Sequence, residues 1–341
     1  MMRHWIILGA ASIVATAWDQ RGSGRNGATA SNETPNVILV VSDGLRWQDV
    51  FTGADSAILF GAPATLGDNP DAVRRKYWRG SAAERRTVLM PFVWGTIVRE
   101  GQLLGNRHLS SVVDVTNGMK FSYPGYNEML VGVPDPRIDR NDFGPNPNVT
   151  VFEWLNRRKE FRGRVAAVGT WDTFRDIFNV GRSRIHIHTN GARPHDALVQ
   201  RVVLPWLKEH EPRAPFVGFA ETDDWAHEGR YDRYLEAAHA VDAYLAELWS
   251  VVQSQPEYRG KTTVIFAADH GRGRTPADWR HHGQDVPGAE ETFIITLGPG
   301  IEARGERRRS AHVLGDVAAA VAAAVGLTYQ VRAPAAGARS R

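Results

Sequence analysis

The chain has 341 residues, of which 43% are hydrophobic and 23% are charged. This length and composition are typical of a globular protein with one large α/β domain. The formal net charge of +3 is only a mild excess of base, which argues against nucleic-acid binding. Cysteine is absent from the sequence, which excludes disulfides, zinc–thiolate sites and a thiol nucleophile. Any metal site must therefore use carboxylates and imidazoles.

The N-terminus has the pattern of a signal peptide. A short polar start precedes an apolar stretch over residues 5–14, and Ala-Thr-Ala at residues 15–17 fits a small-x-small cleavage site. The stretch is too short for a stable membrane span. We expect residues 1–17 to direct export, to the periplasm or as a secreted protein. A membrane anchor or a buried N-terminal helix is the alternative. Residues 18–35, rich in Gly, Ser, Asn and Thr, predict a flexible lead-in.

Short apolar, β-branched stretches then recur along the chain. They lack polar alternation, so each predicts a strand that is buried on both faces. The predicted strands cover residues 36–42, 164–169, 216–220, 262–267 and 293–297.

Helical patterns separate these strands. Residues 231–252 carry apolar side chains at spacings of three and four, and residues 313–325 are rich in alanine and valine. The alternation predicts an α/β fold, with a mainly parallel sheet covered by helices on both faces. We expect one catalytic domain over residues 36–330, with an insertion or lid at 51–85 and a flexible tail at 331–341.

Acidic and histidine side chains stand beside the ends of several predicted strands, where ligands bind in such sheets. They are Asp43, Asp223 with His227, Asp269 with His270, and His282 before the last strand. Gathered together, these acids would repel one another unless cations lay between them. A set of Asp and His without cysteine suits zinc, and manganese or iron would also fit.

Each of these signals is weak by itself. An aspartate after a strand is often a turn or helix-cap residue, and an Asp and a His four apart can simply share one helix face. Their succession at several strand ends is what favours a metal site.

The same segments, in the same order, resemble those of the alkaline-phosphatase superfamily. Residues 37–44 resemble its opening strand and metal aspartate, and residues 122–132 resemble its nucleophile segment. Residues 223–227 and 269–271 resemble its two Asp-His elements. Residues 282–301 resemble its last ligand and closing strand. The resemblance implies an α/β/α sandwich that holds two divalent metal ions, with zinc first and manganese as the alternative.

The resemblance also implies roles for individual residues. It makes Ser122 the catalytic nucleophile, which would form a phosphoserine intermediate during hydrolysis of a phosphoric monoester or diester. It assigns one metal to Asp223, His227 and His282, and the other to Asp43, Asp269, His270 and Ser122. A serine hydroxyl is a poor nucleophile at neutral pH, and coordination to a metal activates it.

Three positions depart from the family pattern. Ala226 stands where the family has Gly, and His281 precedes His282, so either imidazole could be the ligand. The glycine after His282 favours the second. Tyr126 replaces the arginine of the sulfatase signature, so we expect Ser122 to remain serine rather than become formylglycine.

Two residues are candidates for contact with the substrate because of where they lie in the sequence. Asn141 follows the nucleophile segment, and Lys120 would share the face of Ser122 if the chain were extended there. Both could equally be surface residues. We expect a small-molecule anionic ester as the substrate, and the sequence leaves the oligomeric state open.

Other functions stay open at this stage. A sulfuric-ester or phosphonate hydrolase is the alternative within the superfamily, and a non-catalytic envelope-binding relative is the alternative outside catalysis. A membrane-bound transferase would need several spans, for which the sequence has no pattern.

Overall fold

The computed structural model describes residues 35–189 and 196–331. The predicted signal peptide lies outside these residues, as do residues 18–34 of the predicted lead-in and residues 332–341 of the predicted tail. Among the described residues, no helix combines the length and apolar character that crossing a membrane requires.

An eight-stranded sheet forms the centre of the domain, in the order β5-β4-β6-β1-β7-β8-β2-β9. The strands are β1 (Asn36–Ser42), β2 (Gly101–Leu104), β4 (Val165–Gly169), β5 (His186–Thr189), β6 (Ala214–Phe219), β7 (Thr262–Ala267), β8 (Ile294–Leu297) and β9 (Gly305–Glu306). The five strands predicted from the sequence are all present. Paired strands are parallel except that β8 runs antiparallel to both β7 and β2. The mainly parallel α/β fold is therefore confirmed.

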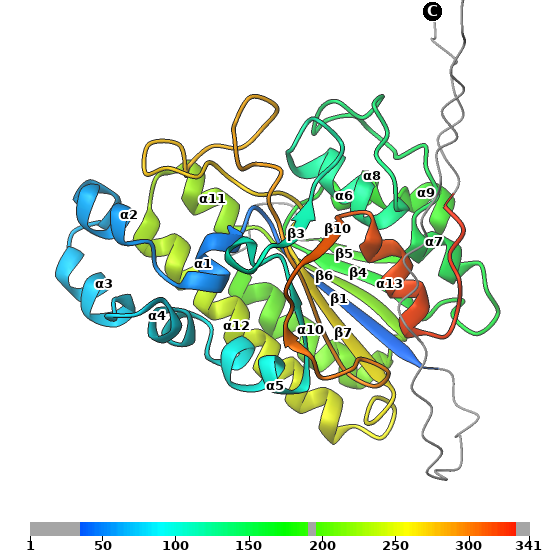
Figure 1. The fold of residues 1–341 in the computed structure, drawn as a ribbon. Helices are drawn as coiled ribbons and strands as arrows, with labels where there is room; N and C mark the ends of the chain where they lie inside the picture. Colours follow the sequence, from blue (N-terminus) through cyan, green and yellow to red (C-terminus); the bar gives the residue numbers. More distant parts are fainter. Residues whose placement is uncertain (1–34, 190–195, 332–341) are drawn as a thin grey trace, which may run out of the picture. The chain divides into compact units, whose positions relative to one another are not determined.

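Helices cover both faces of this sheet, as Figure 1 shows. The helices of the described residues are α1 (Trp47–Thr52), α2 (Ser56–Gly61), α3 (Pro70–Tyr77), α4 (Ala82–Leu89), α5 (Val98–Glu100), α6 (Ser122–Val131), α7 (Val151–Asn156), α8 (Phe174–Ile177), α9 (Val180–Ser183), α10 (Asp196–His210), α11 (Glu221–His227), α12 (Tyr231–Ser254) and α13 (Asp316–Ala324). Three short helical turns are η1 (Pro63–Leu66), the π-helical η2 (Val93–Ile97) and η3 (Arg107–Leu109), and a small parallel sheet pairs β3 (Ser111–Asp114) with β10 (Ser310–Val313).

Alternate side chains of β1 enter two separate cores. Ile38 and Val40 lie in the core formed with α10 and α12, whereas Val37 and Leu39 lie in the core formed with α6, α7 and α13. Every residue of β1 is buried, which explains why its sequence shows no polar alternation.

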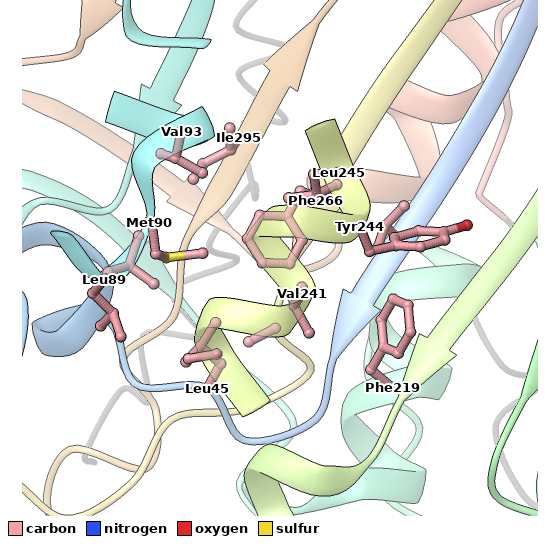
Figure 2. Close-up of a cluster of buried hydrophobic side chains, with 14 of the residues drawn as sticks. Leu45, Leu89, Met90, Val93, Phe219, Val241, Tyr244, Leu245, Phe266 and Ile295 are labelled. Atoms are coloured by element: carbon pink, nitrogen blue, oxygen red, sulfur yellow. The ribbon is translucent and has the colours of Figure 1, made fainter. Parts of the chain in front are cut away.

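The core on the α12 side is drawn in Figure 2. Val241, Tyr244 and Leu245 of α12 belong to one buried cluster with side chains of β6 and β7. Within it, the rings of Tyr244 and Phe219 meet edge to face, with centroids 5.0 Å apart. The predicted insertion contains α2, η1, α3 and the first half of α4, and it contacts α1 and α12. The apolar stripe predicted for residues 231–252 therefore packs α12 against the sheet.

Candidate metal centre

A first cluster of possible metal ligands forms where β1 and β7 end side by side. Asp43 follows β1, and Asp269 and His270 follow β7. The Nε2 atom of His270 lies 3.3 Å from Asp43 Oδ1 and 3.6 Å from Asp269 Oδ2. All three side chains are buried. Their donor atoms converge closely enough to hold one ion.

A second cluster forms beside α11, which follows β6. Asp223 and His227 lie four residues apart on this helix, with His227 Nε2 3.2 Å from Asp223 Oδ2. His282 comes from the loop between β7 and β8. Its Nε2 atom lies 3.5 Å from Asp223 Oδ1 and 2.8 Å from His227 Nε2. The exposed His281 is outside this group, so the structure favours His282 as the sequence did.

The two clusters adjoin each other but differ in exposure. His270 Nε2 lies 3.9 Å from Asp223 Oδ1, which connects them. The side chain of His270 is 0% exposed, whereas that of His227 is 47% exposed. The first cluster is thus closed off by protein, and the second faces solvent on its His227 side.

Ser122 lies at the first cluster as the first residue of α6. Its Oγ atom is 3.4 Å from Asp43 Oδ1 and 3.5 Å from His270 Nε2, and the side chain is buried. The N-terminus of a helix favours negative charge, because its first backbone N–H groups have no partner within the helix. The hydroxyl is therefore next to both the candidate ligands and a favourable position for an anion.

Gly125 allows α6 to approach the end of β7. A Cβ atom at this position would lie 2.4 Å from the carbonyl oxygen of Asp269. We expect Gly125→Ala to lower the free energy of unfolding by about 1–3 kcal/mol, because backbone must move to relieve the overlap. Thermal denaturation measures this. Gly95→Ala is the matched control, because nothing lies within 4 Å of the added atom. Equal melting temperatures for both variants would contradict this account of α6 packing.

Tyr126 and Gly44 orient the ligands of the first cluster. The Tyr126 hydroxyl donates a hydrogen bond to Asp43 Oδ2 (3.2 Å), and the backbone N–H of Gly44 donates to Asp269 Oδ1 (3.0 Å). The Nδ1 atom of His270 lies 2.9 Å from the carbonyl oxygen of Gly271. A carbonyl can only accept, so Nδ1 donates its proton to Gly271, and Nε2 is the ring nitrogen that faces the cluster. From the sequence, Tyr126 was known only as the substitute for a sulfatase arginine.

The carboxylate of Glu128 on α6 accepts hydrogen bonds from the turn that precedes Ser122. It is buried, and the donors are the backbone N–H groups of Thr116 and Asn117 and both of their side chains, at 2.7–3.0 Å. Asn117 Oδ1 in turn accepts from the N–H groups of Met119 and Lys120. Sequence reasoning missed this residue, because a Glu within a helix is expected at the surface.

Arg272 follows the Asp269-His270 pair and is also missing from the sequence-based site. Its guanidinium is 0% exposed and pairs with the carboxylate of Asp223. Burial lowers the pKa of Arg272 to about 9. Its adjacency to the Asp-His-Gly motif was the one signal that could have drawn attention to it.

The carboxylates of the first cluster favour positive charge between them, which a proton on His270 supplies here and a divalent cation would supply instead. Burial and the charge of Asp43 raise the pKa of Asp269. Burial opposes a charge on His270, but the carboxylates of Asp269 and Asp43 outweigh it and raise its pKa to about 9. Burial and the charge of His270 lower the pKa of His282 and of His227, which keeps both imidazoles neutral. Within the described part of the chain, Asp269 Oδ2 is buried and makes no hydrogen bond. A divalent cation would satisfy this oxygen, and the mixed O/N donor set suits zinc or manganese.

The two predicted substrate contacts have other partners. The Lys120 ammonium lies 3.1 Å from Glu290 Oε2, and Asn141 Oδ1 accepts a hydrogen bond from the Tyr123 N–H (2.9 Å). The chain is not extended before Ser122, because Lys120 has φ 55° and α6 begins two residues later. The argument that Lys120 and Ser122 share one strand face was therefore wrong, and their substrate roles stay predictions.

Comparison with known proteins agrees with this geometry. A family model described as the metalloenzyme superfamily matches residues 150–329. Among solved structures, a Vibrio parahaemolyticus protein of the alkaline phosphatase superfamily is 14% identical with a TM-score of 0.56, covering 89% of this chain and 69% of that one. Murine ectonucleotide pyrophosphatase/phosphodiesterase 5, in complex with AMP, is 12% identical with a TM-score of 0.55, covering 86% and 96%. A 2-O GAG sulfatase is 13% identical with a TM-score of 0.54, covering 89% and 72%. No curated protein matches the chain.

The chain belongs to the metalloenzyme superfamily, whose model matches more than half of it. Its fold is similar to that of a solved protein of the alkaline phosphatase superfamily, and its Asp and His clusters suit divalent metal binding.

Proposed function

We propose that this protein is a two-metal hydrolase of phosphoric esters that acts through Ser122. The observation that carries the proposal is the placement of the Ser122 hydroxyl beside Asp43 and His270, at the N-terminus of α6. One ion would be held by Asp43, Asp269 and His270 with Ser122. The other would be held by Asp223, His227 and His282.

The bound ions and Ser122 would contribute different parts of the reaction. Bound divalent ions would lower the pKa of the serine hydroxyl and neutralise charge on the ester oxygens. Ser122 Oγ, having lost its proton to solvent, would then form a bond to phosphorus while the bond to the leaving oxygen breaks on the opposite side. The leaving oxygen would take a proton from water. Tyr126 and the Gly44 N–H keep the carboxylates of Asp43 and Asp269 aimed at the cluster during this step.

The phosphoserine formed in this way must be hydrolysed by water. The exposed side of the second cluster, at His227, offers an approach for water and for the leaving group. Attack on phosphorus breaks the bond to Ser122 Oγ, which regains a proton, and inorganic phosphate or a phosphate monoester departs.

Tyr126 favours hydrolysis of phosphoric esters over hydrolysis of sulfuric esters. Its ring is fully buried among Trp171, Phe174 and Phe216, and its hydroxyl donates to Asp43. A sulfatase-type arginine cannot replace this side chain without losing that packing. Sulfuric-ester or phosphonate hydrolysis is the second candidate, because a 2-O GAG sulfatase shares the fold. A non-catalytic envelope-binding protein is the third.

A panel of esters tests the proposal. The protein is stripped with a chelator, restored with zinc or manganese, and assayed with an aryl phosphate monoester, a diester, a phosphonate monoester and an aryl sulfate. We expect metal-dependent cleavage of a phosphate ester with the highest kcat/KM in the panel, and about two ions per chain. A preference for the sulfate would favour the second candidate. No cleavage of any ester by the metal-loaded protein would favour the third.

A further inference from the structure

Arg272 connects three segments that carry candidate metal ligands. Its Nε donates a hydrogen bond to the Gly44 carbonyl (3.0 Å), and its Nη1 donates to the Arg280 carbonyl (2.7 Å). Its Nη2 donates to the Asp223 carbonyl (3.3 Å) and pairs with the Asp223 carboxylate. Gly44 follows Asp43, and Arg280 lies two residues before His282. One side chain thus reaches the loop after β1, the N-terminal part of α11 and the loop before β8.

The cost of burying this charge indicates a specific role. The side chain of Arg272 is fully buried, so its charge has lost the water that hydrated it. This free-energy cost is offset only if the N–H donors find well-placed acceptors. The planar guanidinium can satisfy several acceptors in different directions, which a lysine ammonium on a flexible stem does less well. Here the acceptors are three backbone carbonyls and the Asp223 carboxylate, all beside or within the ligand set.

We propose that Arg272 is a positioning residue that builds the cluster of Asp223, His227 and His282 before any ion binds. The inference rests on the metal-ligand assignment of the proposed function. Without the guanidinium, the Asp223 carboxylate and the loop that carries His282 lose a shared anchor. Ion binding must then also order these groups, which weakens it.

The charge of Arg272 and its positioning role predict opposite changes in cation affinity when Arg272 is replaced. A positive charge beside a cation site repels the cation, so its removal should tighten binding if charge alone mattered. Removal of a positioning group should weaken binding instead. The sign of the change in affinity therefore separates the two effects.

Zinc binding to the full-length protein tests the proposal. Wild type, Arg272→Gln, Arg272→Lys and Arg274→Gln are stripped and titrated with zinc against a chelating indicator, with circular dichroism as a check on folding. We expect one of the two sites to weaken by about 10- to 100-fold in Arg272→Gln and less in Arg272→Lys. Arg274 is the matched control two residues away, because its half-exposed guanidinium pairs with Glu290 and Glu291.

Each outcome has a distinct meaning. Unchanged or tighter zinc binding in Arg272→Gln would overturn the positioning role, and so would equal weakening in Arg274→Gln. If Arg272→Gln does not fold, wild-type affinity in a folded Arg272→Lys would overturn it. Failure of wild type itself to bind zinc would instead count against the proposed function.

Discussion

Replacing Ser122 by alanine is expected to lower kcat/KM for the preferred ester by at least about 1000-fold, which corresponds to about 4 kcal/mol of lost transition-state stabilisation. The loss follows because the variant has no oxygen that can form the covalent intermediate, and the surrounding ligands cannot supply one. Steady-state assays of metal-loaded wild type and variant measure it. Acid-quenched wild type should also carry phosphate on the peptide that contains Ser122.

Controls separate this loss from damage to the site. Ser56→Ala is the matched control, because Ser56 is an exposed serine at the start of another helix, α2. The metal content of Ser122→Ala should fall by less than one ion per chain, because Asp43, Asp269 and His270 remain. Full activity in Ser122→Ala would show that another group is the nucleophile.

Replacing Glu128 by alanine is expected to lower the free energy of unfolding by about 4 kcal/mol or more. Four donors from Thr116 and Asn117 would lose the buried carboxylate that accepts from them, and each hydrogen bond to a charged group contributes about 1 kcal/mol or more. Denaturant titration of the metal-free protein measures the change. Activity should fall as well, because the turn before Ser122 loses its anchor.

The exposed Glu160 gives the matched control for this substitution. Glu160→Ala should change stability by less than about 0.5 kcal/mol. Glu128→Gln keeps one acceptor oxygen but places an amide group opposite the Asn117 donors, so we expect an intermediate loss. A stable Glu128→Ala protein with unchanged activity would contradict the role assigned to this carboxylate.

The strands and ligand-bearing loops could be predicted because their signals are local. Residues 36–42 and 262–267 are continuous apolar stretches, and the observed strands have the same bounds. The antiparallel direction of β8 could not be predicted, since strand direction depends on which neighbours pair and not on the strand's own sequence. The short strands β2 and β9 likewise form through pairing with distant segments.

The supporting residues of the site were harder to find for the same reason. Asp43, Asp269 and His270 stand at strand ends, where the sequence directs attention. Arg272 bonds Gly44, which is 228 positions away in sequence, and Glu128 bonds a turn 11–12 residues before it. No local pattern marks either side chain as buried and paired. For Lys120 the prediction assumed an extended chain, whereas the hydrogen bonds from Asn117 fold that segment into a turn.

The central position of β1 has a consequence for how the protein is made. β1 is the first described strand to be synthesised, yet it pairs with β6 and β7, and Asn36 bonds Thr262 across 226 positions of sequence. A growing chain on the ribosome therefore carries an apolar strand without these partners until β6 and β7 have been synthesised. Pairing between such remote segments slows folding and exposes the strand to aggregation. The ligand set itself can assemble only after His282 has been synthesised, so neither metal site is complete while the earlier segments are being made.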